Sequence, residues 1–174
     1  IARMDQDDIA TPNRLYAQVQ FMEANPEVVV CGTQGIIIDS DKHFITPQHD
    51  AQIRSMLFFG SSFIHPSVMI RKEVLDKGKV KYNPDYLHAE DYGLWIELAS
   101  LGKMANIPEV GILYRKHLNQ YTSVFNNKMK MTVAIVAQKY LSENNLLVSD
   151  AERSVYNTLL VKDYNNAGKH KIQA

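Results

Sequence analysis

The sequence predicts an α/β fold, followed by two C-terminal helices. Short β-branched runs bounded by Gly, Pro and Asn alternate with segments of helical periodicity over residues 1–115. From residue 126 the pattern of apolar residues changes, and two longer segments of helical periodicity follow one another. An acid-rich segment near the N-terminus follows a short apolar lead, and open α/β sheets bind their ligands at the carboxyl ends of strands.

The composition is that of a soluble globular domain. The chain has 174 residues, of which 45% are hydrophobic and 22% charged. Its 19 basic and 19 acidic residues cancel, so no overall field recruits nucleic acid or anionic lipid. No apolar run reaches the length of a membrane span. The only cysteine, Cys31, lies in an apolar run, which predicts a buried, inert thiol in a reducing compartment.

The first elements are predicted as a strand end, a helix and a hairpin. Residues 1–4 finish a strand, and Thr11-Pro12 starts a helix with a hydroxyl N-cap and proline at its first position. Asn25-Pro26 stops that helix. The β-branched runs 28–31 and 36–38 follow, and residues 35–45 are predicted to form a hairpin. The helical stripe consists of Leu15, Val19 and Met22.

The middle of the chain is predicted to alternate between short helices and one strand. Residues 50–59 form a short helix that ends at Gly60. Residues 63–71 form a strand, and its proline implies an edge position or a bulge. Residues 71–77 form a short helix closed by Gly78, and residues 82–87 form a loop.

The last elements are a buried helix, a strand pair and the C-terminal helices. A helix opens at His88 or Ala89 and runs to Leu101. Residues 103–115 are predicted as two strands broken at Pro108. Two helical stripes follow, and Ser149 or Asp150 caps the second. We divide the chain into residues 1–123, which carry the candidate site, and a helical extension at residues 124–174.

Three carboxylates, Asp5, Asp7 and Asp8, fall within four residues. Side chains alternate along an extended segment, so Asp5 and Asp7 are expected to face one ligand while Asp8 turns outward toward the next helix. Hard oxygen ligands of this kind suit Mg²⁺ or Mn²⁺, which often bridge a carboxylate and a substrate diphosphate. The plainer alternative is a solvated turn, and the residues alone leave it open.

A second acidic pair, Glu90-Asp91, begins the helix at residues 89–101. The helix dipole favours negative charge there, which is sufficient to explain Glu90. Asp91 lies on the same face as Leu94, Trp95 and Leu98, so it is expected to line a pocket wall. Partial desolvation raises the pKa of such a carboxyl group, as a general base requires.

Other polar residues stand among apolar neighbours. For His65 a satisfied core histidine is the more common explanation, whereas Arg71, at the end of the predicted strand, could meet a phosphate or a carboxylate. Arg115 and His117 follow an apolar run, and a neutral His117 imidazole is a candidate metal ligand. Each of these signals is weak when taken alone.

Five segments, in order, resemble the motifs of family 2 glycosyltransferases. They are A-R-M-D-Q-D-D with P-N-R-L at residues 2–15, N-P-E-V-V-V-C-G at 25–32, H-P-S-V-M-I-R at 65–71, A-E-D-Y-G-L-W at 89–95 and Y-R-K-H at 114–117. The resemblance implies a GT-A fold, which is Rossmann-like with a mixed sheet. It also implies that the chain is a fragment lacking the N-terminal nucleoside-binding half, and that this fragment alone is inactive.

The resemblance further implies an inverting, metal-dependent transfer from a nucleotide-sugar donor to a carbohydrate or lipid-linked carbohydrate acceptor. Asp91 would be the base, and Mn²⁺ or Mg²⁺ would be the cofactor. A cytoplasmic location follows, with peripheral attachment to the inner face of the membrane as an option, and self-association is an expectation from an exposed sheet edge. The metal ligands would be Asp5, Asp7, Asp8 and His117. The residues expected to contact donor or acceptor are Arg3, His65, Arg71, Glu90 and Arg115.

The sequence departs from the family pattern at two positions. Gln6 stands where the family has a small residue, and Gly93 replaces an acid. Two rival functions stay open at this point. One is a non-catalytic module that binds carbohydrate or a partner on a degenerate transferase scaffold, and the other is a nucleotidyltransferase of the same overall fold.

Overall fold

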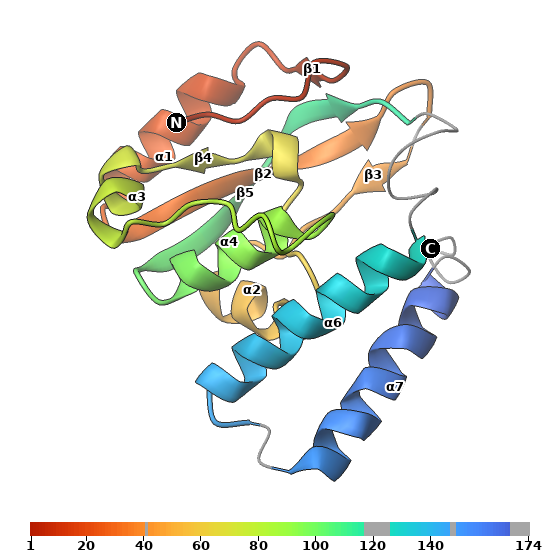
Figure 1. Ribbon diagram of the computed structural model, residues 1–174. Helices are drawn as coiled ribbons and strands as arrows, with labels where there is room; N and C mark the ends of the chain where they lie inside the picture. The colour runs from red at the N-terminus through yellow and green to blue at the C-terminus, as the bar shows by residue number, and fades with distance from the viewer. Residues whose placement is uncertain (41, 117–125, 147–148, 168–174) are drawn as a thin grey trace.

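The fold is mixed α/β, as predicted. The computed structural model describes residues 1–40, 42–116, 126–146 and 149–167. Within these residues a mixed sheet has helix α1 (Arg14–Ala24) on one face and helices α2 (Asp50–Met56), α4 (Glu90–Ala99) and α6 (Asn126–Glu143) on the other (Figure 1). Helix α7 (Asp150–Ala167) packs beside α6, so the two predicted C-terminal helices are present.

The centre of the sheet is a parallel pair, β2 (Val28–Ile37) and β5 (Lys103–Tyr114). Strand β1 (Ile9–Ala10) pairs antiparallel with the end of β5. Strands β3 (His43–Phe44) and β4 (Met69–Ile70) pair antiparallel with different parts of β2 along its other edge. The β2–β3 pairing confirms the predicted hairpin. Because β2 and β5 run in the same direction, both end on the side of the sheet where β3 lies.

The predicted break at Pro108 is wrong, because β5 is one strand. Its pairing register with β2 shifts between Gly32 and Gln34, opposite the part of β5 that contains Pro108. Proline has no N–H to donate to the ladder, so it is accommodated where the ladder is already irregular. The ladder resumes at Val110.

The predicted strand at residues 63–71 is also mostly wrong. His65–Ser67 form a 3-10 turn, and only Met69–Ile70 form a strand. The Ser67 N–H donates to the Ile64 carbonyl, so the chain turns where an extended segment was expected. The N-terminal segment compensates by pairing with this region: the Arg3 N–H donates to Val68 O at 2.9 Å and the Ile70 N–H to Ile1 O at 2.8 Å.

Helix α1 differs from its prediction at its start and on its inner face. The Thr11 hydroxyl donates to Val110 O instead of capping the helix, which begins at Arg14. Leu15 and Val19 are exposed. The buried residues of the helix are Arg14, Gln18 and Met22.

The other helices lie close to their predicted positions. Helix α3 (Lys72–Gly78) is followed by its C-cap residue Lys79, which adopts a left-handed conformation with φ of 52°. Helix α7 is capped by Ser149, whose hydroxyl accepts from the Glu152 N–H. Cys31 is fully buried, and burial raises the pKa of its thiol to about 12, which agrees with an inert thiol.

Helix α4 is buried on almost every side. Its largest core residues, Tyr92, Trp95 and Leu98, are each no more than 1% exposed. Gly93 completes this packing: a Cβ at that position would lie 2.3 Å from a ring carbon of Tyr86. Any larger residue would therefore displace the Tyr86 ring. Burial thus fixes the start of α4, where the second acidic pair lies.

Candidate functional site

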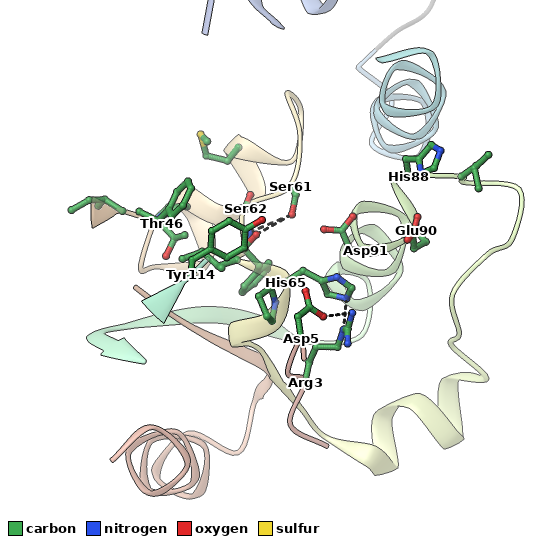
Figure 2. Close-up of a pocket in the computed structure, with 18 residues that line it drawn as sticks. Arg3, Asp5, Thr46, Ser61, Ser62, His65, His88, Glu90, Asp91 and Tyr114 are labelled. Atoms are coloured by element: carbon green, nitrogen blue, oxygen red, sulfur yellow. Dashed lines mark hydrogen bonds and ion pairs between the residues drawn. The ribbon is translucent and has the colours of Figure 1, made fainter. Parts of the chain in front are cut away.

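A pocket of about 780 Å³ lies between the N-terminal segment, the start of α4 and the end of β5 (Figure 2). Its wall combines apolar and aromatic side chains with a few polar groups, as is usual for ligand pockets. The polar and aromatic residues that line it include Arg3, Asp5, Phe44, Thr46, Ser61, Ser62, His65, His88, Glu90, Asp91 and Tyr114.

Arg3 is the centre of a polar cluster in this pocket. Its Nη2 lies 2.6 Å from Oδ1 of Asp5, and its Nε donates to Nε2 of His65 at 3.2 Å. Arginine can only donate, so Nε2 of His65 must accept and the imidazole is neutral with its proton on Nδ1. The Tyr82 hydroxyl, 2.9 Å from the same nitrogen, then acts as a second donor. Burial lowers the pKa of His65, which agrees with the neutral ring.

Asp91 faces the pocket from the first turn of α4. It points into the space between Ser61 and His65, whereas Glu90 lies on the other side of the helix in this view (Figure 2). Burial raises the pKa of Asp91. Glu90 is exposed. A carboxyl group with a raised pKa at a pocket wall is suited to proton transfer near neutral pH.

The three N-terminal acids lie at residues 5–8, a segment that we call the acid loop, and their side chains have different environments. Asp5 lines the pocket, whereas Asp7 and Asp8 do not. Asp8 is only 9% exposed, so the prediction that it turns outward is wrong. Its Oδ1 accepts from the Arg115 N–H at 2.8 Å, and burial raises the pKa of this carboxyl group. The Asp7 side chain is exposed, and its carbonyl accepts from Nε of Arg115 at 2.9 Å.

The acid loop can hold a metal ion only if other groups, such as substrate phosphates and water, supply the remaining ligands. Among the described residues, no group of three or more His, Cys, Asp or Glu side chains has the arrangement of a metal site. Mg²⁺ is commonly held by one or two carboxylates, with substrate phosphates and water as the other ligands. Oδ2 of Asp8 is buried and has no hydrogen-bond partner among the described residues. The hard oxygens of Asp7 and its neighbours therefore fit such an ion.

Of the remaining predicted residues, Arg71 and Arg115 do not line the pocket. The Arg71 guanidinium donates to the carbonyls of Val28, Met22 and Asn25, where it ties the end of α1 to the start of β2. We therefore leave Arg71 out of the candidate site. Arg115 binds the acid loop through its backbone and its side chain. His117 lies outside the described residues.

Sequence reasoning missed part of the pocket wall. The rings of Phe44 and Tyr114 meet edge to face with centroids 5.4 Å apart, at the ends of β3 and β5. Thr46 is held by buried Gln34, whose Oε1 accepts from the Thr46 N–H at 2.7 Å. Ser61 accepts from Nε1 of Trp95 at 3.0 Å. The only signal in the sequence was an aromatic residue at the end of each predicted strand.

Comparison with known proteins agrees with the resemblance seen in the sequence. Residues 1–79 match the family model described as Glycosyl transferase family 2. The chain is 36% identical over 157 residues to an uncharacterized glycosyltransferase of Haemophilus influenzae, a match that covers 82% of this chain and 47% of the relative.

Two further relatives carry names that state a pathway. The amylovoran biosynthesis glycosyltransferase AmsE of Erwinia amylovora is 36% identical over 117 residues, covering 63% of this chain and 42% of the relative. The O-antigen biosynthesis glycosyltransferase WbnJ of Escherichia coli is 33% identical over 124 residues, covering 67% and 47%. The chain spans about half the length of these relatives.

No described helix is long and apolar enough to cross a membrane. The mixed sheet, the acid loop beside the pocket and the family match over residues 1–79 are consistent with one another. Together with the named relatives, they support glycosyltransferase family 2 as the family of this chain.

Proposed function

We propose that the protein is an inverting glycosyltransferase that moves a sugar from a nucleotide-sugar donor to a hydroxyl group of a carbohydrate acceptor. The observation that carries the proposal is the pocket, which is lined by Asp91 on one side and by Arg3 and Asp5 on another. The names of the relatives favour an acceptor in polysaccharide or O-antigen synthesis, either free or linked to a lipid.

In this proposal Asp91 is the general base. Its carboxylate takes the proton of the acceptor hydroxyl while that oxygen attacks the anomeric carbon of the donor sugar. The bond from the anomeric carbon to the diphosphate oxygen breaks, and the diphosphate leaves with the electron pair. One displacement inverts the anomeric centre. The raised pKa of Asp91 gives the carboxylate the basicity that this step requires.

The acid loop is the proposed site of the metal ion and the donor diphosphate. Asp7, with Asp5 or Asp8, would hold Mn²⁺ or Mg²⁺, and the ion when bound would neutralise charge on the leaving diphosphate. Arg3 and His65 order the loop from the pocket side, because the Arg3–Asp5 ion pair and the Arg3–His65 hydrogen bond share one guanidinium. We also retain His117 as a proposed ligand on the strength of the family motif.

Phe44 and Tyr114 are proposed to contact the acceptor. Their rings line the pocket at the ends of β3 and β5, across from the start of α4. Apolar ring faces beside a few polar groups suit a neutral sugar, which offers both C–H faces and hydroxyl groups. Glu90 also lines the pocket, at the start of α4, and we assign it to acceptor contact, not to proton transfer.

The test compares Asp91→Asn with Glu90→Gln in the intact protein, with acceptor-dependent transfer as the readout. Asp91→Asn keeps the shape of the side chain and should lower turnover by about 10²–10⁴-fold, the usual value of a positioned base. Glu90→Gln should have a much smaller effect, because its carboxylate is exposed. Normal transfer by Asp91→Asn together with failure of Glu90→Gln would reverse the two roles. Thermal melts of both variants would control for folding.

A further inference from the structure

Arg14 is a buried guanidinium directly behind the pocket wall. It belongs to the P-N-R-L segment, to which the proposed function assigns no role. Its side chain is only 3% exposed. Nη2 donates to Arg3 O at 2.7 Å and lies 3.5 Å from Val68 O, and Nη1 lies 3.4 Å from the Met4 sulfur. One side chain on α1 therefore reaches both the N-terminal segment and the turn that carries His65.

Gln18, one helical turn further along α1, extends these contacts. Its Oε1 accepts from Nε of Arg14 at 3.1 Å. Its Nε2 donates to Cys31 O at 2.7 Å and to Ser67 O at 2.9 Å. The pair thus connects strand β2, the 3-10 turn His65–Ser67 and the backbone at Arg3. These segments carry two pocket residues, Arg3 and His65, which also bond to each other.

The charge of Arg14 is unusual, because every acceptor in these contacts is neutral. None of the ion pairs among the described residues involves its guanidinium. Burying a charge without an ionic partner is costly, so packing does not explain the choice of residue. A guanidinium presents several donors in a fixed planar fork, whereas lysine presents one compact ammonium group. The fork geometry explains how Arg14 can donate hydrogen bonds to two chain segments and to Gln18 at the same time.

We propose that Arg14 is a positioning residue of the pocket, which holds the Arg3–Met4 backbone against Val68 and thereby sets Arg3 and Asp5 beside His65. The inference rests on the proposed function for its catalytic consequence, but the positioning itself is measurable without any substrate. Arg14 touches no reacting atom in this account. Its effect on transfer passes through Arg3 and Asp5.

The chain offers a matched control in Arg71. Like Arg14, this residue donates to backbone carbonyls of more than one segment, those of Val28, Met22 and Asn25, but it does not line the pocket. Arg14→Lys and Arg71→Lys each keep the charge and lose the fork. Arg14→Lys should lose more stability, because Arg14 is more deeply buried than Arg71, and the location of the loosened backbone should differ between the two variants.

The first readout is amide hydrogen exchange in the intact protein without ligand. Arg14→Lys should speed exchange of the Arg3 amide by about tenfold or more, and Arg14→Gln should have a stronger effect. The reason is that the Arg3 N–H donates to Val68 O, and Arg14 holds these two segments together. Arg71→Lys should instead speed exchange around residues 22–28. Unchanged exchange at Arg3 in both Arg14 variants, or equal acceleration there in Arg71→Lys, would overturn the inference.

The second readout is transfer with a nucleotide-sugar donor. Arg14→Lys should lower kcat/KM by up to about 10²-fold, the cost of displacing pocket groups by roughly an ångström, whereas Arg71→Lys should stay near the wild type. Normal transfer by Arg14→Lys, despite fast exchange at Arg3, would overturn the role in the pocket. If the unaltered protein transfers no sugar, the proposed function fails, and the exchange experiment still decides whether Arg14 positions the segment.

Discussion

Two acid-bearing regions face the candidate site, and different forces hold them in place. The start of α4 is fixed by apolar burial, since Tyr92 and Trp95 are almost completely enclosed. The acid loop is fixed by individual polar contacts: Arg3 with Asp5 at one end, and Arg115 with the Asp8 carboxylate at the other. The same residue type is thus placed by packing in one region and by hydrogen bonds in the other.

This difference bears on what each region can do. A close-packed helix keeps its groups in one position, because displacing them would open voids or create clashes. A loop held by a few hydrogen bonds readjusts more readily when a charged ligand arrives. The fixed proton acceptor therefore belongs to α4 in the proposed reaction, and the metal and diphosphate belong to the acid loop.

Removing the exposed acid of the loop should have the largest effect. Asp7→Ala should abolish metal-dependent binding of a nucleoside diphosphate to the intact protein, because the proposed ion would lose a principal carboxylate ligand. Calorimetry with Mn²⁺ and a nucleoside diphosphate measures this directly. Asp85→Ala, which removes an exposed acid elsewhere, provides the control. Unchanged affinity in Asp7→Ala would remove the acid loop from the metal site.

Removing the buried acid should loosen the loop. Asp8→Ala leaves the Arg115 N–H without its carboxylate acceptor and should cost about 1–3 kcal/mol in the free energy of unfolding. Asp8→Asn keeps an acceptor oxygen and should cost less. Urea titrations of the two variants measure the difference. Equal losses would mean that the Arg115 contact does not hold the loop.

The packing of α4 can be tested at Gly93. Gly93→Ala puts a methyl group 2.3 Å from a Tyr86 ring carbon and should lower the free energy of unfolding by about 1–3 kcal/mol. The same change in a Tyr86→Ala background should cost much less, because the clashing ring is gone. If Gly93→Ala is equally costly in both backgrounds, the Tyr86 contact is not what requires glycine.

The smallest predicted effect is a gain in stability. The native pKa of Asp91 is raised, so between the unfolded and native pKa values the native state binds more protons than the unfolded state. The free energy of unfolding therefore falls as pH rises through that window. Asn does not titrate, so Asp91→Asn should be more stable than the wild type at neutral pH. Thermal melts should show that advantage shrinking toward acidic pH, and an advantage independent of pH would contradict the raised pKa.

Much of the fold was predictable, because caps and breakers mark the ends of its elements. Asn25-Pro26 ends α1, and the periodicity after residue 126 gives the two C-terminal helices. The misses have physical reasons. The apolar neighbours of His65–Ser67 predict an extended segment, yet these residues form a 3-10 turn with Pro66 at its start. Pro108 predicts a break between two strands, but a register shift in the ladder accommodates it.

The site was predictable in its acids but not in the contacts that arrange them. The face of α4 that carries Asp91 followed from helical periodicity. The inner face of α1 did not, because exposed Leu15 and Val19 mimic a core stripe while Arg14 and Gln18 are buried. A hydrophobic pattern cannot reveal a buried polar network whose acceptors are backbone carbonyls of distant segments. Asp8 was misplaced for the same reason, since its acceptor role depends on the Arg115 N–H more than a hundred residues away.

The role of Asp91 as the base can be tested in the pH profile of acceptor-dependent transfer. In the intact protein kcat/KM should rise with pH through an apparent pKa above the 3.8 of an ordinary aspartate, as Asp91 becomes a carboxylate. In Asp91→Asn the residual kcat/KM should be low and should not show this rise with pH (the acidic limb of the profile). A variant that keeps both the limb and the rate of the wild type would contradict the assignment of Asp91.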